Sequence, residues 1–214
     1  MTSTLILASA SPARRQVLRS AGIDPVVRVS DVDEDAVAAA LPAGTAPETV
    51  VVELARAKAA NIASRADIDD YADDCVIVGC DSMLLFDGAL QGKPHTPEVA
   101  RARWSEMAGR SADLITGHCV LRLRAGGIVA EAVDCSTTRV HFAKPEPEEL
   151  EAYLATGEPL QVAGAFTLDG KGGWFVDRIE GDPSSVIGIG LPLLRRLLRD
   201  VGTGVTQLWS DPAR

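Results

Sequence analysis

The sequence predicts an α/β protein built on one mixed, twisted sheet with flanking helices. Residues 75–80 (CVIVGC) form an uninterrupted apolar run, which is typical of a strand covered on both faces. Two longer strand-like segments, 114–123 and 128–142, meet at the small residues 125–127, and this indicates an antiparallel hairpin. Helical segments alternate with the other strands, so the sheet is expected to be mixed rather than purely parallel.

Shorter strands complete the expected sheet. Apolar runs predict strands at 5–8, 24–29 and 174–179. The apolar segment 83–86 follows the central run and leads into an expected turn at 87–88.

Five helices are expected, and four of them open with a proline, whose fixed φ and missing N–H suit the first helical turn. The predicted helices cover residues 12–22, 47–65, 97–107, 146–153 and 191–199. Acidic or glycine-rich connections are expected at 31–35, 67–74 and 164–173.

Length and charge exclude several classes of protein. A chain of 214 residues is expected to form one domain over residues 1–214 with an ample core. Its 21 basic and 30 acidic side chains give a formal charge of −9, which argues against a nucleic-acid or anionic-membrane binder. No run approaches the roughly 20 apolar residues of a membrane helix, and the start lacks the basic n-region of a secretory signal. A cytoplasmic location is expected, and an anionic small substrate is still allowed where a few cations converge.

The cysteines and histidines suggest no metal centre. The four cysteines form no CxxC pair and lie in or beside apolar runs, so buried reduced thiols are expected rather than zinc or a disulfide. They are Cys75, Cys80, Cys119 and Cys135. The three histidines are scattered along the chain.

The first feature that suggests chemistry is the turn between the strand at 5–8 and the helix after it. Ser9 and Ser11 lie in this turn, and Arg14 lies in the first turn of the helix. A helix N-terminus presents unpaired N–H groups that bind anions, and hydroxyls and a guanidinium strengthen such a site. The alternative is a capped helix whose arginines are solvated.

A lysine interrupts the apolar stripe of the helix at 47–65. The stripe consists of Val51, Leu54 and Ile62, and Lys58 falls between them where an apolar residue is expected. A buried, unpaired ammonium is unfavourable by several kcal/mol, so Lys58 should meet an anion or a carboxylate, or else extend to solvent.

Further acidic and basic residues follow the central strand. Asp81 and Ser82 come directly after the apolar run, at the strand end where α/β sheets place their chemistry, although an aspartate there also caps turns. Lys93, in a Gly-Lys-Pro triplet, could fold back toward the same end. Glu34, in an acidic turn that is otherwise simply solvated, would complete a divalent-cation site if it lay near Asp81. Together these are the components of metal-assisted attack on a phosphate.

Six segments of the chain recur together in one known family. They are LASASPARR (7–15), Asp33-Glu34, LARAKA (54–59), GCDSMLLFDGALQGKP (79–94), TGEPLQVAGAF (156–166) and IEGDPSSVIGIGLPLL (179–194). In order and spacing they resemble the Maf family of cytosolic nucleoside triphosphate pyrophosphatases, also called septum formation inhibitors. The resemblance implies two lobes around a central cleft, a fold related to the inosine triphosphate pyrophosphatases, and a homodimer.

The resemblance also implies an activity and a set of site residues. The reaction would be hydrolysis between the α- and β-phosphates with Mg²⁺ or Mn²⁺, clearing non-standard or excess nucleotides and linked to cell-division arrest. Carried over motif by motif, the resemblance implies that Ser9, Ser11 and Arg14 would hold the phosphates. Lys58 and Lys93 would neutralise the charge of the triphosphate, and Glu34 and Asp81 would bind the metal. Asp81 would also be the general base for the attacking water.

Three positions depart from the branch of the family that resembles dTTP/UTP pyrophosphatases. That branch has SPRR, a threonine after the catalytic aspartate and a glutamine in its AYGIQG-like loop, where this chain has Ala13, Ser82 and Asp169. Alanine replaces a cation and aspartate replaces an amide, so the groups that would face the nucleobase of a substrate differ from that branch. This difference weighs against a pyrimidine nucleotide as the substrate. Asp169 would suit a base with N–H donors, as guanine has, and loosely matches the 7-methyl-GTP branch.

Two other functions compete with this one. A nucleotide-sensing regulator of septation could bind triphosphates with little turnover, but Asp81 and both lysines are intact where a retired enzyme could have lost them. An inosine/xanthosine triphosphate pyrophosphatase would share the reaction, but the SxSPxR and GKP motifs point elsewhere.

Overall fold

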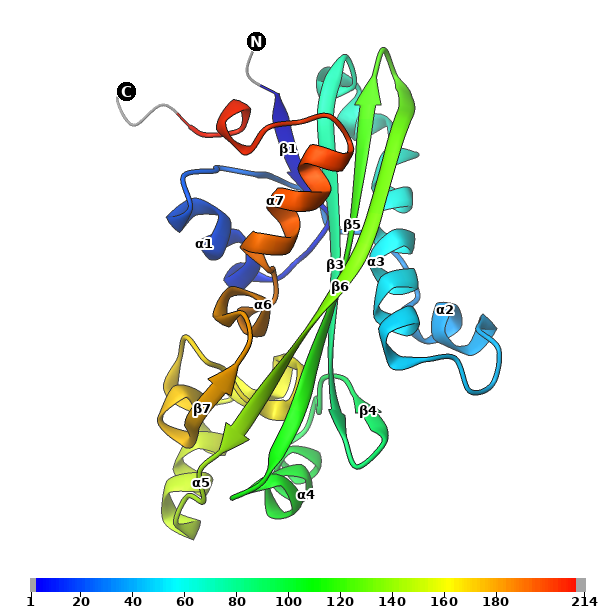
Figure 1. The fold of residues 1–214 in the computed structure, drawn as a ribbon. Helices are drawn as coiled ribbons and strands as arrows, with labels where there is room; N and C mark the ends of the chain where they lie inside the picture. Colours follow the sequence, from blue (N-terminus) through cyan, green and yellow to red (C-terminus); the bar gives the residue numbers. More distant parts are fainter. Residues whose placement is uncertain (1–2, 211–214) are drawn as a thin grey trace.

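A computed structural model describes residues 3–210, which contain one seven-stranded mixed sheet with helices on both faces (Figure 1). The strand order is β2-β1-β3-β5-β6-β7, and β4 pairs with β3. β1 is parallel to β2 and β3, whereas the remaining pairs are antiparallel. The strands are β1 (Thr4–Leu7), β2 (Val26–Val27), β3 (Asp74–Phe86), β4 (Ala89–Gln91), β5 (Ser111–Arg124), β6 (Gly127–Phe142) and β7 (Val176–Glu180). The predicted mixed sheet is confirmed.

The helices divide between the two faces and the far end of the sheet. α3 lies along one face, α1 and α7 lie on the other, and α4 and α5 cover the lower end in Figure 1. The helices are α1 (Pro12–Ser20), α2 (Glu34–Ala40), α3 (Pro47–Ala63), α4 (Pro97–Met107), α5 (Pro147–Ala155), α6 (Pro183–Ile187) and α7 (Leu191–Asp200). Within residues 3–210, no helix is both long enough and apolar enough to span a membrane.

Strand β3 explains how the core is divided. Its side chains alternate between faces, so Val76 and Val78 pack with α1 and α7 while Ile77 packs with α3. Farther along the same strand, Leu84 and Phe86 belong to an aromatic-rich cluster with α4 and α5. Three regions of core thus share one long strand. The cleft between the lobes and the single domain over residues 1–214 stay predictions.

Several elements differ from the sequence prediction. The acidic stretch predicted as a turn at 31–35 leads into α2, because the Asp33 carboxylate accepts from the Ala36 N–H (2.9 Å) and caps a helix. The short α6 was not predicted, and the strand expected at 24–29 contracts to β2. The expectation that Asp81 and Ser82 follow the end of the central strand is wrong, because β3 stays paired with β5 and continues through them to Phe86. Trp174, expected in a strand, lies in a 3₁₀ turn (Lys171–Phe175) that precedes β7.

The cysteines are free thiols, as expected. Cys75, Cys80 and Cys119 are buried, and burial raises the pKa of each thiol. Cys135 is only half-buried, so the expectation of full burial is wrong for this residue, which lies on β6 where the strand is less covered.

Helix α3 approaches the sheet closely because two glycines lie beneath it. A Cβ atom at Gly79 would lie 2.1 Å from the Ala55 carbonyl oxygen, and one at Gly117 would lie 2.3 Å from the Val51 carbonyl oxygen. Both contacts are with helix backbone, which cannot move aside by changing a rotamer. The glycines therefore set the distance between α3, which carries Lys58, and the two central strands.

Replacing Gly79 with alanine is expected to lower the free energy of unfolding by about 3 kcal/mol, because it overpacks a rigid contact. It should also displace Lys58. Urea unfolding of Gly79→Ala beside Gly127→Ala, whose nearest atom would be 3.8 Å away, measures the effect. Equal midpoints for Gly79→Ala and the wild type would show that α3 is not seated on this glycine.

Candidate functional site

Lys58, Asp81 and Glu34 form a charged cluster near the end of the parallel part of the sheet. Lys58 Nζ lies 2.6 Å from Asp81 Oδ1 and 2.8 Å from Glu34 Oε1. The side chains of Lys58 and Asp81 are each 8% exposed, whereas Glu34 is 47% exposed at the rim. The lysine on the apolar stripe therefore meets carboxylates, which was one of the two outcomes its position predicted.

Burial and neighbouring charges shift the two carboxylates in opposite directions. Burial raises the pKa of Asp81 above its ordinary value; Lys58 and Arg14 oppose the rise and Glu34 adds to it. Burial also acts to raise the pKa of Glu34, but the hydrogen bond from Lys58 and the charges of Lys58, Lys93 and Arg14 outweigh it and lower that pKa. Asp81 is therefore the better proton acceptor of the two.

Arg14 joins three distant segments beside this cluster. Its Nε donates to the Gly188 carbonyl (2.8 Å), and its Nη1 donates to the Cys80 carbonyl (2.8 Å). Nη1 also donates to Ser9 Oγ (3.1 Å), and Nη2 donates to Ser82 Oγ (3.2 Å). Four of the five N–H donors of a guanidinium are thus used inside the protein, which leaves one for a ligand.

A line of hydroxyls orients Ser82. Thr116 Oγ1 donates to the Ser185 carbonyl (3.0 Å), so its single proton is used. The Ser82 hydroxyl must then donate to Thr116 Oγ1 (3.0 Å) and accept from Arg14. Ser82 is thus fixed by protein partners on both sides. Sequence reasoning missed Thr116 and Ser185, because one lies inside a long strand and the other in the unpredicted α6.

The predicted phosphate turn follows the end of β1, beside the β3 segment that leads to Asp81. The Ala8 N–H donates to the Val78 carbonyl (2.9 Å), and this pairing brings Ser9 beside the segment that leads to Asp81. Ser11 caps α1, because its Oγ accepts from the Arg14 N–H (3.4 Å). A pocket of about 300 Å³ opens here, lined by Ser9, Ala10, Ser11, Pro12, Arg15, Gln16, Arg19 and Val27.

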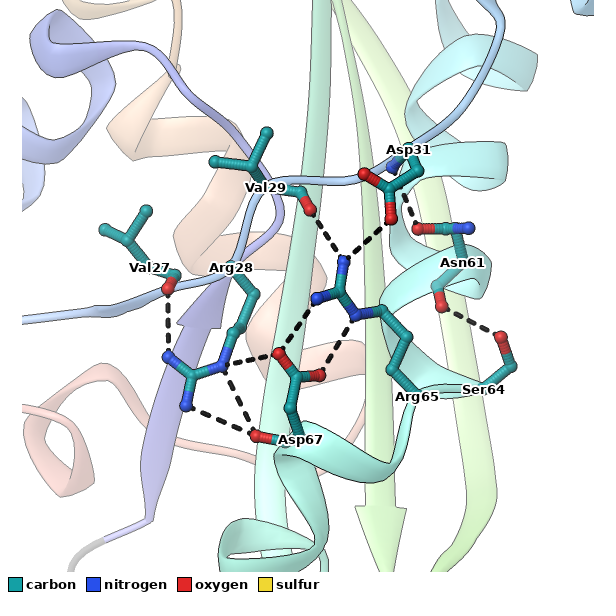
Figure 2. A network of polar contacts seen from close by, with 8 residues as sticks. All are labelled: Val27, Arg28, Val29, Asp31, Asn61, Ser64, Arg65 and Asp67. Carbon is teal, nitrogen blue, oxygen red and sulfur yellow. Dashed lines mark hydrogen bonds and ion pairs between the residues drawn. The ribbon is translucent and has the colours of Figure 1, made fainter.

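Hydrogen bonds and an ion pair connect the segment that leads to Glu34 with the end of α3 (Figure 2). Arg65 Nη1 donates to the Val29 carbonyl (2.9 Å) and to Asp31 Oδ2 (3.2 Å). The Asp31 N–H donates to Asn61 Oδ1 (3.2 Å). Because Asn61 lies on α3 and Arg65 just beyond its end, the approach to Glu34 is fixed to the helix that also carries the buried lysine.

Lys93 and Asp169, the remaining predicted site residues, are both exposed. Lys93 lies in the turn after β4, and its charge helps to lower the pKa of Glu34. Asp169 lies between two 3₁₀ turns and makes no hydrogen bond or ion pair within residues 3–210. The structure therefore relates Lys93 electrostatically to the charged cluster and gives Asp169 no polar link to it.

His118 supports the loop that holds Arg14. It is fully buried on β5, and its Nε2 accepts from the Gly190 N–H (2.9 Å), two residues beyond the carbonyl that binds Arg14. Its Nδ1 then carries the proton and donates to the Thr116 carbonyl (3.2 Å). Burial and the charge of Arg14 lower the pKa of His118 to about 4, against the partial opposition of Thr116 and Asp134.

Acidification should therefore destabilise the protein through His118. Its folded-state pKa lies below the value of about 6.5 expected when unfolded, so the unfolded chain binds the extra proton. Stability is fully present above pH 6.5 and falls by about 3 kcal/mol toward pH 4. Urea unfolding between pH 4 and 7 should show a steeper loss for the wild type than for His118→Asn. Equal losses of unfolding free energy between pH 7 and pH 4 in the two proteins would contradict this role of His118.

Comparison with known proteins gives the family. Residues 4–201 match the family described as Maf-like protein. The chain belongs to the Maf family. A relative from Nocardia farcinica named nucleoside triphosphate pyrophosphatase is 85% identical over 214 residues, covering all of both chains. The same name is carried by a Rhodococcus jostii protein, 69% identical over all of this chain and 99% of its own, and by a Mycobacterium sp. (strain JLS) protein, 54% identical over 98% of this chain and all of its own.

Asp81 and Glu34 are the candidate metal-ligating residues of this Maf family protein. Within residues 3–210 no group of three or more His, Cys, Asp or Glu side chains is placed to hold a metal ion. Mg²⁺, however, commonly takes one or two protein carboxylates and completes its coordination with water and substrate phosphates. Two carboxylates that converge on one ammonium are therefore a donor set that fits such an ion together with a phosphorylated substrate.

Proposed function

We propose that this chain hydrolyses nucleoside triphosphates to a nucleoside monophosphate and pyrophosphate. The observation that carries the proposal is the buried Lys58–Asp81 pair with Glu34 at its rim, beside the serine-lined turn before α1. A buried carboxylate next to converging cations suits attack of water on a phosphoanhydride. The name shared by the relatives supports the same reaction.

Asp81 is the general base in this proposal. Its Oδ1 accepts from Lys58, which holds the carboxylate in place. Its Oδ2 makes no hydrogen bond within residues 3–210 and is the atom assigned to receive the proton. As that proton moves from water to Asp81, the water oxygen bonds to phosphorus and the P–O bond between the α- and β-phosphates breaks. Pyrophosphate and the nucleoside monophosphate then leave.

The cations and hydroxyls around Asp81 bind the triphosphate. Lys58 and Lys93 offset its charge, and the hydroxyls of Ser9 and Ser11 bind phosphate oxygens together with the N–H groups at the start of α1. Arg14 chiefly fixes this arrangement, because only one of its donors is left for a phosphate.

Glu34 and Asp81 are the residues that would hold Mg²⁺ or Mn²⁺. A divalent cation bound there withdraws charge from the phosphates and makes water more acidic. The lowered pKa of Glu34 keeps this carboxylate ionised at neutral pH, which supports its assignment as a ligand.

The base of the substrate is proposed to be one with N–H donors, as in guanine. Asp169, an exposed acceptor, supports this choice, and Ala13 and Ser82 remove groups expected for a pyrimidine site. Clearance of non-standard or excess nucleotides, a cytoplasmic location, a homodimer and a link to cell division belong to the same proposal and are supported by the family resemblance.

Pyrophosphate release from a panel of standard and modified triphosphates tests the proposal. We expect release with Mg²⁺ or Mn²⁺, none in EDTA, and faster turnover of 7-methyl-GTP than of dTTP. Comparable rates for these two substrates would overturn the choice of base. Triphosphate binding without release from any substrate would favour a nucleotide-sensing regulator instead.

A further inference from the structure

Arg103 is a half-buried cation without a carboxylate partner within residues 3–210. It lies on α4, and its Nη1 donates to the Gly92 carbonyl (2.6 Å). Burial lowers its pKa, and no acidic neighbour offsets the effect. Arg101, two residues earlier, instead makes a two-point ion pair with Glu151 at 2.6 and 2.8 Å. Because partial burial of an unpaired charge is unfavourable, the placement of Arg103 requires an explanation.

The turn that Arg103 touches is the one that carries Lys93. The Gly92 carbonyl also accepts from the Gly164 N–H (3.3 Å), and the His95 N–H donates to the Leu160 carbonyl (3.0 Å). The turn is thus held between α4 on one side and the segment before Phe166 on the other. Lys93 is exposed, so these contacts of the neighbouring backbone determine where its ammonium can reach.

We propose that Arg103 is a positioning residue that fixes the Lys93 turn, so that the Lys93 ammonium meets the phosphates of the substrate. This inference rests on the proposed function. Arg103 acts through the Gly92 carbonyl, which it holds next to Lys93. A carboxylate partner for Arg103 would place a negative charge near the bound phosphates and repel them. The missing partner therefore suits a site that binds an anion.

A double-mutant cycle on the binding of pyrophosphate, at fixed Mg²⁺, tests the coupling. Calorimetry on the full chain would compare the wild type, Arg103→Met, Lys93→Met and the double variant. We expect each single change to weaken binding about tenfold, and the double variant to bind within about twofold of Lys93→Met, because the two residues act as one unit. Arg103→Lys, which keeps a donor and the charge, should recover most of the affinity, and Arg101→Met should match the wild type.

Amide exchange at His95 supplies a second measurement that needs no ligand. Arg103→Met should speed exchange of this amide, whereas Lys93→Met and Arg101→Met should not. Losses in affinity that simply add in the double variant, or an unchanged His95 amide, would overturn the positioning role.

The two proposals fail in different ways. A wild-type protein that binds pyrophosphate but releases none from any triphosphate would overturn the proposed function, while the binding cycle would still decide the role of Arg103. A wild-type protein that releases pyrophosphate from triphosphates, but whose affinity for pyrophosphate does not depend on Arg103, would overturn the positioning role alone.

Discussion

Replacing Asp81 with asparagine is expected to slow pyrophosphate release about a thousandfold while leaving the fold intact, because a positioned general base contributes two to four orders of magnitude. Asparagine keeps an oxygen that can accept from Lys58 at the position of Oδ1. It cannot take a proton from water. The turnover number of Asp81→Asn tests the expected loss of activity, and its unfolding midpoint tests whether the fold is intact.

Asp87→Asn is the matched control for this change. Asp87 lies in the exposed turn that follows the same strand, and it pairs with Arg110 rather than with the charged cluster. Asparagine tolerates its positive φ, so both activity and stability should be unchanged. An Asp81→Asn enzyme within about tenfold of the wild type would show that another group accepts the proton.

Replacing Lys58 with methionine should lower the free energy of unfolding by about 3 kcal/mol, because it leaves buried charge without its partner. Asp81 and Glu34 would then face each other with no ammonium between them, and pyrophosphate release should also be lost. Urea unfolding at neutral pH measures the stability effect.

Removing the second charge should restore part of the lost stability. The double variant with Lys58→Met and Asp81→Asn no longer contains an uncompensated aspartate, so it should be more stable than Lys58→Met alone. Arg56→Met on the same helix is the control, because its ion pairs with Glu53 and Glu131 are substantially exposed and should contribute less than about 1 kcal/mol. Equal losses for Lys58→Met and Arg56→Met would contradict the importance of the buried pair.

Two members of the charged cluster could be predicted because each breaks a local pattern. Lys58 stands where the stripe of α3 calls for an apolar residue, and Asp81 directly follows the apolar run 75–80. A buried charge must find a partner, so the sequence alone restricts where these residues can go. The long hairpin of β5 and β6 was equally predictable, because small residues separate two extended segments.

Other parts of the site depend on contacts that side-chain patterns do not report. Two of the groups that hold Arg14 are the backbone carbonyls of Cys80 and Gly188, and carbonyls are the same in every residue. The acidic stretch before α2 has the composition of a turn, and only the capping contact of Asp33 makes it a helix start. Arg103 looks like any charged residue on a helix surface until its neighbours are known.

Identification of the products by phosphorus NMR tests the central claim most directly. The purified protein with Mg²⁺ would be incubated with the triphosphate it hydrolyses fastest, beside Asp81→Asn. We expect pyrophosphate and nucleoside monophosphate in equal amounts from the wild type and almost none from the variant. Orthophosphate with a nucleoside diphosphate, or equal turnover by both proteins, would contradict hydrolysis between the α- and β-phosphates by the Asp81 cluster.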